Sequence, residues 1–393
     1  MLKDWTEGAS QDRSAAGEAT RLSLLQALVE QTEWRAPALK RFVFDRIIKS
    51  AASPYKSVRQ RAGQFVAAIL TTDPTWLHNG QLSKLPTWEQ FTSELGTIVI
   101  NWVQSLGSPQ SENQESLKEF VLNSPEFTKS KLMMEVLGSS VGSVVTRIPV
   151  CLISLLPPCL ALDALSMGID EELRALAITS SAILGMGRLD AEPARETFIN
   201  TIQKLCKESP SWQTRRQTLC VTQVSTFHNI YLLRRSSISY ASLIRQLLVE
   251  SLNDPTVEVR EMASVTLSGL FQCGFFEPET DLITKFNQLA LVRVPKIGTT
   301  NRDVIVRQRH AGVLGLAAVV SASPYSVPKF LPEVLLNLTD HVGDPPPIAA
   351  TARRALTDFR RTHHDQWFVH RENFTEDQLA ALSSVLVSPN YYA

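Results

Sequence analysis

The sequence predicts an all-α fold in which pairs of helices follow one another along the chain as an α-solenoid. Apolar residues recur with helical spacing over most of the 393 residues, whereas runs of alternating β-branched residues are scarce. Proline turns such as Ser53-Pro54, Asp254-Pro255 and Asp344-Pro345 separate the periodic segments. One motif also recurs within these segments. Helices joined by short turns over such a length are typical of a solenoid.

Each predicted helix is a segment whose apolar residues return every three or four positions, bounded by proline, glycine or polar residues. Residues 1–18 are polar, and we expect them to be disordered. We expect helices at residues 19–31, 36–51, 55–71, 87–106, 112–122, 129–146, 150–166, 170–186, 191–207, 212–233, 238–252, 256–272, 279–290, 303–321, 327–341, 346–360 and 375–386. The most apolar stretch, residues 144–162, is broken by Arg147 and three prolines, so it predicts buried helices rather than a membrane span.

The recurring motif reads Pro-x3-Val-Arg-x2-Ala-x3-Leu-x2-Leu. It occurs at residues 255–270, at 54–69 with conservative changes, and at 173–184 without its proline. Proline is tolerated in the first helical turn, the apolar positions share one helix face, and the alanine allows a close neighbour. The arginine can reach the next repeat. This pattern is typical of the second helix of HEAT repeats and predicts an α-solenoid of HEAT-like helix pairs.

Charge, cysteine usage and the N-terminal residues exclude several classes. Lys plus Arg and Asp plus Glu number 39 each, which gives no reason to expect direct nucleic-acid or membrane binding. The five cysteines are scattered and never in CxxC spacing, which argues against a disulfide framework and a zinc site. Residues 1–15 are polar and do not form a signal peptide, so we expect a cytosolic or nuclear protein.

No catalytic constellation is present in the sequence. It has no GxSxG, P-loop or GxGxxG motif, and Cys220 with His228 is a pair that a helix brings together by chance. The adjacent His363 and His364 would point about 100° apart on a helix, which does not favour a shared metal ion. We therefore predict a non-enzymatic protein with no catalytic residue and no metal ligand.

Basic residues form several local groups. Residues 307–310 (RQRH) begin an Ala/Gly/Leu-rich segment, and they fit either contact with an acidic partner or capping of the concave solenoid face. The pairs at 129/131, 215/216 and 234/235 are candidates for anion binding. Adjacent basic residues are more often a solvated helix edge, and we favour that interpretation for each pair.

The C-terminal residues Tyr391, Tyr392 and Ala393 form a hydrophobic-Tyr-x tail that ends in a carboxylate. Pro389 fixes one φ angle and prevents a preceding helix from continuing. Termini are usually polar and frayed, so a terminal aromatic pair either packs on its own domain or is held out for a partner. Capture of a C-terminal carboxylate is a known mode of peptide recognition. The residues alone leave both alternatives open.

Several blocks near the C-terminus carry a resemblance to a known family. They are residues 259–263 (VREMA), 266–270 (TLSGL), 309–316 (RHAGVLGL), 359–365 (FRRTHHD) and 386–393 (LVSPNYYA). Over roughly residues 210–393 the chain resembles the C-terminal region of the proteasome activator complex subunit 4 family, which are single-chain HEAT-repeat activators of the proteasome core particle. Family members are several times longer, so the resemblance implies the C-terminal part of an activator.

The resemblance implies a docking function for the tail. In the family the terminal hydrophobic-Tyr-x motif inserts into the α-subunit ring of the core particle and promotes gate opening. Tyr391, Tyr392 and Ala393 are then the docking residues, and ubiquitin-independent degradation of peptides and proteins is the expected activity. Acetylated histones are further expected partners, in DNA repair and spermatogenesis, with a location in the nucleus and cytoplasm.

The family's C-terminal region also resembles an acetyl-lysine reader with a bromodomain-like Asn-Phe pair. This sequence has Gly274 and Phe275 there, and glycine has no side-chain amide to bind an acetyl carbonyl. The family implies inositol phosphates as ligands, without assigning residues, and no other cofactor is expected. We divide the chain into residues 1–18, HEAT-like repeats at 19–209, C-terminal repeats at 210–386 and the tail at 387–393. A histone-binding module and a plain HEAT scaffold are the alternative functions.

Overall fold

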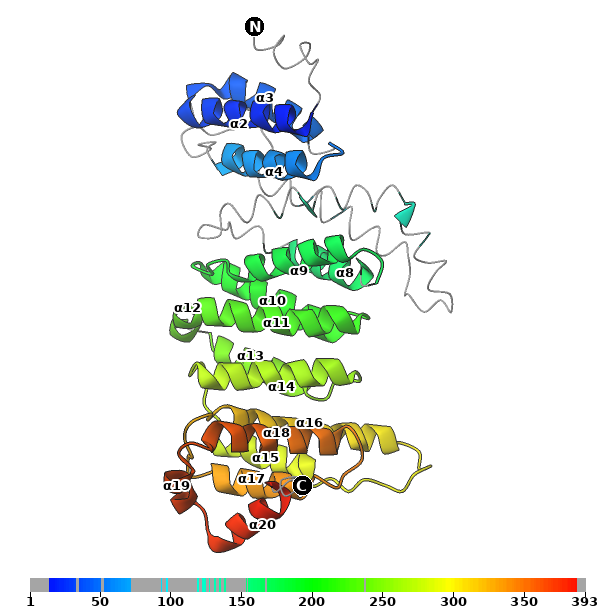
Figure 1. Cartoon of the computed structure of the whole chain (residues 1–393), viewed down its shortest axis with the longest axis vertical. Helices are drawn as coiled ribbons and strands as arrows, with labels where there is room; N and C mark the ends of the chain where they lie inside the picture. Colours follow the sequence, from blue (N-terminus) through cyan, green and yellow to red (C-terminus); the bar gives the residue numbers. More distant parts are fainter. Residues whose placement is uncertain are drawn as a thin grey trace. The chain divides into compact units, whose positions relative to one another are not determined.

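The computed structural model describes residues 14–32, 35–50, 53–71, 153, 155–166, 168–236 and 238–386, with isolated positions between 93 and 138. The chain divides into two compact units, Met1–Leu189 and Asp190–Ala393 (Figure 1). None of the described residues lies in a β-strand, which confirms the all-α prediction for this part of the chain. The helices predicted at 87–106, 112–122 and 129–146 lie mostly outside the described residues.

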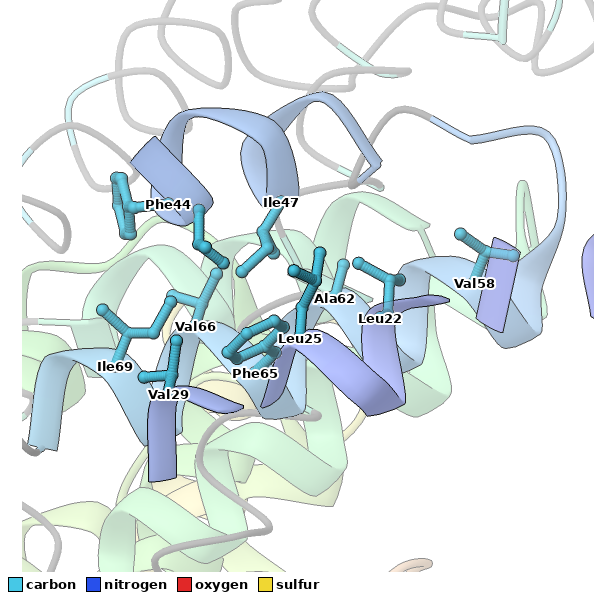
Figure 2. Packing of buried hydrophobic residues seen from close by; sticks show 11 residues of the cluster. Leu22, Leu25, Val29, Phe44, Ile47, Val58, Ala62, Phe65, Val66 and Ile69 are labelled. Atoms are coloured by element: carbon cyan, nitrogen blue, oxygen red, sulfur yellow. The ribbon is translucent and has the colours of Figure 1, made fainter. Parts of the chain in front are cut away.

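The first unit contains two groups of packed helices. α2 (Ala15–Thr32) and α3 (Pro37–Ser50) both pack against α4 (Lys56–Thr71), and α8 (Leu156–Ser166) packs against α9 (Glu171–Gly185). Figure 2 shows apolar side chains of α2, α3 and α4 meeting between these helices. The motif at 54–69 supplies much of this core, because Val58, Ala62, Val66 and Ile69 are all fully buried.

Helix α2 begins at Ala15, four positions before the predicted start. Ser14 explains the earlier start, because its Oγ accepts a hydrogen bond of 3.2 Å from the backbone N of Gly17. The carbonyl of Ser14 also accepts from the backbone N of Glu18 at 3.1 Å. A serine that binds an otherwise unpaired amide in this way is a helix N-cap.

The second unit is a succession of helix pairs. Its elements are α10 (Glu192–Glu208), α11 (Trp212–His228), α12 (Ile230–Arg235), α13 (Tyr240–Ser251), α14 (Val257–Gln272), α15 (Thr280–Ala290), α16 (Arg302–Ser321), α17 (Leu331–Thr339), α18 (Ile348–His363), α19 (Trp367–His370), the 3-10 turn η4 (Arg371–Asn373) and α20 (Glu376–Leu386). Helices α11, α14, α16 and α18 pack one on the next, and α10, α13, α15 and α17 each pack on a helix of this row. This arrangement confirms the predicted solenoid of helix pairs within the unit.

Three elements of this unit differ from the prediction. The helix expected at 212–233 is two helices, which separate at Asn229, where the backbone has φ −111° and ψ 17°. The Asn229 side chain donates to the Ser225 carbonyl at 3.0 Å, and the Asn229 backbone N donates to the same carbonyl at 3.0 Å. Helix α17 starts at Leu331 rather than 327, with Pro332 in its first turn. The short helix α19 was not predicted.

Helix α11 buries hydroxyl groups where its neighbours bury aliphatic side chains. Thr214, Thr218 and Thr222 are almost fully buried on this face. The hydroxyls of Thr218 and Thr222 donate to the carbonyls one turn earlier, at 2.7 and 2.8 Å, which satisfies them without a partner from another helix. Threonine therefore serves as a core residue here. Among the described helices, none combines the length and the apolar character needed to cross a bilayer.

Replacing Gly312 with alanine should destabilise the second unit, because α15 and α16 approach most closely there. A Cβ atom at Gly312 would lie 2.3 Å from the Ala290 nitrogen and 2.6 Å from the Phe286 oxygen, both backbone atoms that cannot rotate away. Overpacking of this kind typically costs about 1–3 kcal/mol, which outweighs the gain in helix propensity of about 1 kcal/mol. Gly343→Ala is the control, since nothing lies within 4 Å of its Cβ position. Denaturant unfolding of both variants should separate them; equal stability would contradict the close approach.

Candidate functional site

The predicted docking residues Tyr391, Tyr392 and Ala393 lie outside the described residues, so their prediction stays a prediction. The structure describes the helix that precedes them. Helix α20 packs against α17 and α18, and its Leu382 is 1% exposed. The chain is therefore fixed to the second unit up to Leu386, seven residues before the C-terminus.

An aromatic cluster lies between α18 and the elements that lead to α20. The His363 ring stacks on Phe359 at a centroid distance of 4.1 Å and lies 5.0 Å from the His370 ring. His363 is buried, with Nε2 at 3.1 Å from the Ser326 carbonyl, whereas His364 is exposed. The two adjacent histidines thus occupy different environments. Within the described residues, no group of His, Cys, Asp and Glu side chains could hold a metal ion.

Gly274 and Phe275 end helix α14. Gly274 has φ +67°, and its nitrogen donates to the Phe271 carbonyl at 3.0 Å. The Phe275 nitrogen donates to the Leu270 carbonyl, which completes a helix stop that requires a left-handed residue. The Phe275 ring is 2% exposed and lies 5.5 Å from the Phe276 ring. Gly274 therefore ends the helix and Phe275 fills the core, and the acetyl-lysine site at these positions stays a prediction.

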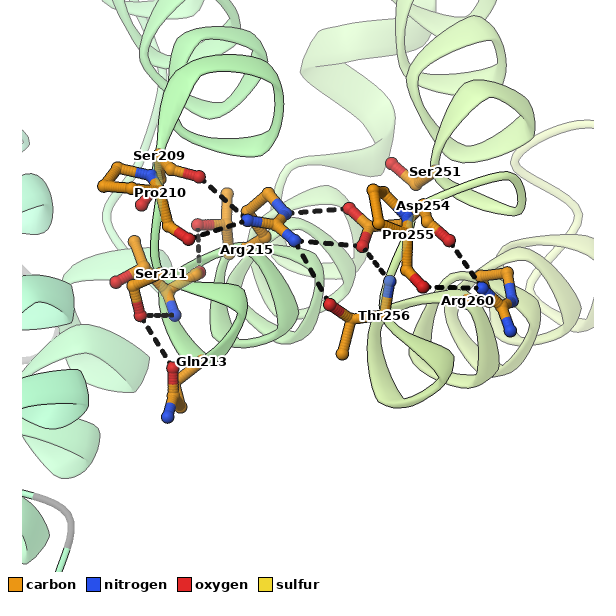
Figure 3. A network of polar contacts seen from close by, with 12 residues as sticks. Ser209, Pro210, Ser211, Gln213, Arg215, Ser251, Asp254, Pro255, Thr256 and Arg260 are labelled. Atoms are coloured by element: carbon orange, nitrogen blue, oxygen red, sulfur yellow. Dashed lines mark hydrogen bonds and ion pairs between the residues drawn. The ribbon is translucent and has the colours of Figure 1, made fainter. Parts of the chain in front are cut away.

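Three arginines link successive helices of the second unit, and we call Arg215, Arg260 and Arg309 the arginine ladder. Arg215 on α11 donates through Nη1 to the carbonyls of Ser209 and Pro210, at 2.9 and 3.2 Å. Its Nε and Nη2 form a bidentate pair with the Asp254 carboxylate, at 2.7 and 3.0 Å, just before α14 (Figure 3). Such two-point pairs fix geometry as well as adding energy.

Arg309 repeats this arrangement one step further along the unit. Its Nε and Nη2 bind the Asp344 carboxylate at 2.7 and 2.8 Å, just before α18. The same carboxylate also contacts the buried His341 ring, with 2.8 Å between Oδ2 and Nδ1. The basic segment at 307–310 therefore contributes one inter-repeat ion pair. Of the two arginines in this segment, Arg309 forms that ion pair.

Arg260 is the middle position of the ladder and differs from the other two. Its Nη1 donates to the carbonyls of Asp254 and Pro255, at 2.7 and 3.0 Å (Figure 3). Its Nε donates to Nδ1 of His310 at 3.1 Å, and Nε2 of His310 lies 2.9 Å from the Thr351 hydroxyl. An accepting Nδ1 requires a neutral ring with its proton on Nε2, so His310 donates to Thr351. Burial and the Arg260 charge lower the pKa of His310 from 6.5 to about 3.

The predicted reach of the motif arginine is confirmed for Arg260 in this unit and for Arg59 in the first unit. Arg59 binds the carbonyls of Ser53 and Pro54 and pairs with Glu135. Arg174, which lacks the preceding proline, instead contacts Asp163 and Glu171, both earlier in the chain.

Arg215 was the ladder residue that sequence reasoning missed, because we expected a solvated helix edge there. The signal was present in the sequence. Pro210 lies five positions before Arg215, as in the motif, but threonine and serine replace the apolar residues that follow. A pattern that admitted threonine at core positions would have found this repeat.

The comparisons with known proteins point to one family. The family model described as "Proteasome activator complex subunit 4-like, C-terminal" matches residues 306–393. The chain is 32% identical over 395 residues to Proteasome activator complex subunit 4 of Homo sapiens, covering 96% of this chain and 21% of that protein. It is 33% identical to the Xenopus laevis protein, with the same coverage. It is 23% identical to Proteasome activator BLM10 of Saccharomyces cerevisiae, covering 97% of this chain and 18% of that protein. The chain thus spans about a fifth of the length of these relatives.

Proposed function

The chain belongs to the proteasome activator complex subunit 4 family, and from this premise we propose that it acts as the docking end of a proteasome activator. In this proposal the repeats form a non-enzymatic support, and the tail at Tyr391–Ala393 binds the α-subunit ring of the proteasome core particle. Binding promotes opening of the gate and ubiquitin-independent degradation of peptides and proteins.

One observation carries the proposal: the match to the family's C-terminal model runs through the last residue, so the tail belongs to the shared region. The position of α20 supports it. A tail that follows a helix packed on α17 and α18 starts from a fixed point, which lowers the entropy lost when it binds.

The tail residues have the chemistry for such a site. The Ala393 carboxylate would accept charge-assisted hydrogen bonds from a lysine in a pocket between α-subunits. The rings of Tyr391 and Tyr392 would fill apolar space in the pocket. Each hydroxyl could form a hydrogen bond with a polar group at the edge of the pocket. A three-residue tail buries little surface, so the repeats would supply a second contact that raises the effective concentration of the tail.

Gate opening requires preferential binding to the open state. A tail that contacted open and closed rings equally would shift nothing, so the tyrosines would contact the turn that supports the gate in its open position. The proposed location follows the partner and is the nucleus and cytoplasm, where core particles degrade proteins.

Co-sedimentation with purified core particle tests the proposal directly. The full chain should move with the core particle through a gradient in a saturable manner, and it should increase the hydrolysis of a fluorogenic peptide. Bovine serum albumin at the same concentration serves as the negative control. A chain that stays at the top of the gradient at all concentrations would reject the docking function.

A further inference from the structure

The arginine ladder has one position without a carboxylate. Arg215 and Arg309 each hold an aspartate that precedes the next long helix of the row, whereas Arg260 meets the neutral ring of His310. The remaining contacts of the Arg260 guanidinium are to two backbone carbonyls. Its side chain is 5% exposed, and it forms no ion pair within the part of the chain that the structure describes. Its Nη2 therefore has no hydrogen-bond acceptor there.

The loop before α16 explains the missing aspartate. Asp254 and Asp344 both lie directly before a proline that leads into the next helix of the row. Helix α16 instead follows Asn301, which has φ 71° and forms no side-chain cap. Asp303 lies in the first turn of α16 but is exposed and forms no ion pair among the described residues. Among the described residues, no aspartate before α16 occupies the position that Asp254 and Asp344 occupy before α14 and α18.

A second guanidinium lies near Arg260. Arg307 is on α16, one turn before His310, and its Nε is buried with no hydrogen-bond partner among the described residues. Burial lowers the pKa of Arg260, and the charge on Arg307 lowers it further. Asp254, Glu258 and Glu261 act in the opposite direction. Asp254 is already paired with Arg215, and both glutamates are exposed. Arg307 precedes His310, the partner of Arg260, by one turn, so two like charges lie on the facing helices where α14 packs against α16.

We propose that Arg260 and Arg307 form a binding site for a small oxyanion, of the carboxylate or phosphate class, between α14 and α16. A buried charge is costly unless it is paired, and the two neighbouring ladder arginines are paired with carboxylates. The forked donors of a guanidinium match the oxygens of either class. A bound oxyanion would accept from the unpaired Nε of Arg307 and neutralise the repulsion between the two arginines. Its source is either a free ion or an acidic side chain presented to this site.

Thermal unfolding of the full chain tests the site with two probes, sodium phosphate and sodium acetate, each replacing sodium chloride at constant ionic strength. Phosphate should raise the Tm of the unsubstituted chain until the effect saturates. In Arg307→Gln the concentration for half of the effect should rise about tenfold or more, as expected for one lost charge-assisted hydrogen bond. Arg307 is only half-buried, so this variant should fold, whereas Arg260 is too deeply buried for a clean substitution.

Arg354→Gln is the matched control, because Arg354 is an exposed arginine on α18. It loses the same charge and should respond to phosphate as the unsubstituted chain does. A saturable rise with both probes shows that the site accepts carboxylates as well, which is the chemistry of an acidic side chain. A rise with phosphate alone assigns it to free phosphate. No saturable rise with either probe, or an unchanged response in Arg307→Gln, overturns the proposal.

Discussion

Deleting Tyr391, Tyr392 and Ala393 is expected to abolish binding of the chain to the proteasome core particle while leaving its stability unchanged. The deletion removes both aromatic rings and moves the terminal carboxylate to Asn390, so none of the groups proposed to enter the pocket is left in place. Each hydrogen bond to a charged group contributes about 1.5–3 kcal/mol, so loss of the carboxylate alone should weaken binding about tenfold to a hundredfold. Gradient co-sedimentation and peptide hydrolysis measure binding and stimulation on the same samples.

Two further variants separate the contribution of the carboxylate to binding from that of the aromatic rings. Adding one alanine after Ala393 keeps both tyrosines but moves the carboxylate, and it should weaken binding nearly as much as the deletion does. Replacing Tyr391 and Tyr392 with alanine keeps the carboxylate in place. All three should unfold at the same temperature as the parent, because the buried contacts of α20 lie before residue 387. Undiminished stimulation by the deleted chain would exclude the tail as the docking element.

The repeat architecture could be predicted because its signals are local. The proline, the arginine and the apolar spacing at 255–270 lie within one helix, and the structure forms α14 there. The break at Asn229 was not predictable from periodicity, because the apolar pattern continues through this position while its backbone leaves the helical conformation. Short elements such as α19, with only four residues, carry too little periodicity to be detected.

For the ladder arginines, the sequence predicts a contact with the next repeat but not the residue that each arginine contacts. The sequence indicates that the motif arginine reaches the next repeat, but the residue it meets depends on how two helices align in space. Arg260 and His310 are 50 positions apart, and only the packing of α14 on α16 brings them together. Gly274 illustrates the converse case. Its lack of a side chain is visible in the sequence, yet its positive φ explains why glycine suits that helix end.

Acidification is expected to destabilise the second unit through His310, which links α14, α16 and α18. Burial, and then the charge on Arg260, lowers the pKa of this ring to about 3 in the folded chain. The pKa of a histidine in the unfolded chain is about 6.5. Between these two values the unfolded chain binds one more proton than the folded chain does. The contribution of His310 to the free energy of unfolding is therefore fully present above pH 6.5. It decreases as the pH falls towards 3.

The linkage relation gives the size of the effect. From this one ring, the free energy of unfolding should decrease by about 2 kcal/mol between pH 7 and pH 5, and by about 3 kcal/mol at pH 4. Other groups titrate in the same range, including His370, whose pKa burial also lowers. The variant His310→Gln isolates the contribution, because a side-chain amide can accept from Arg260 and donate to Thr351 without titrating. Denaturant unfolding at pH 7, 5 and 4 should show a shallower loss in the variant. Parallel losses in both chains would mean that His310 is protonated in the folded state, and its bond from Arg260 would then not exist.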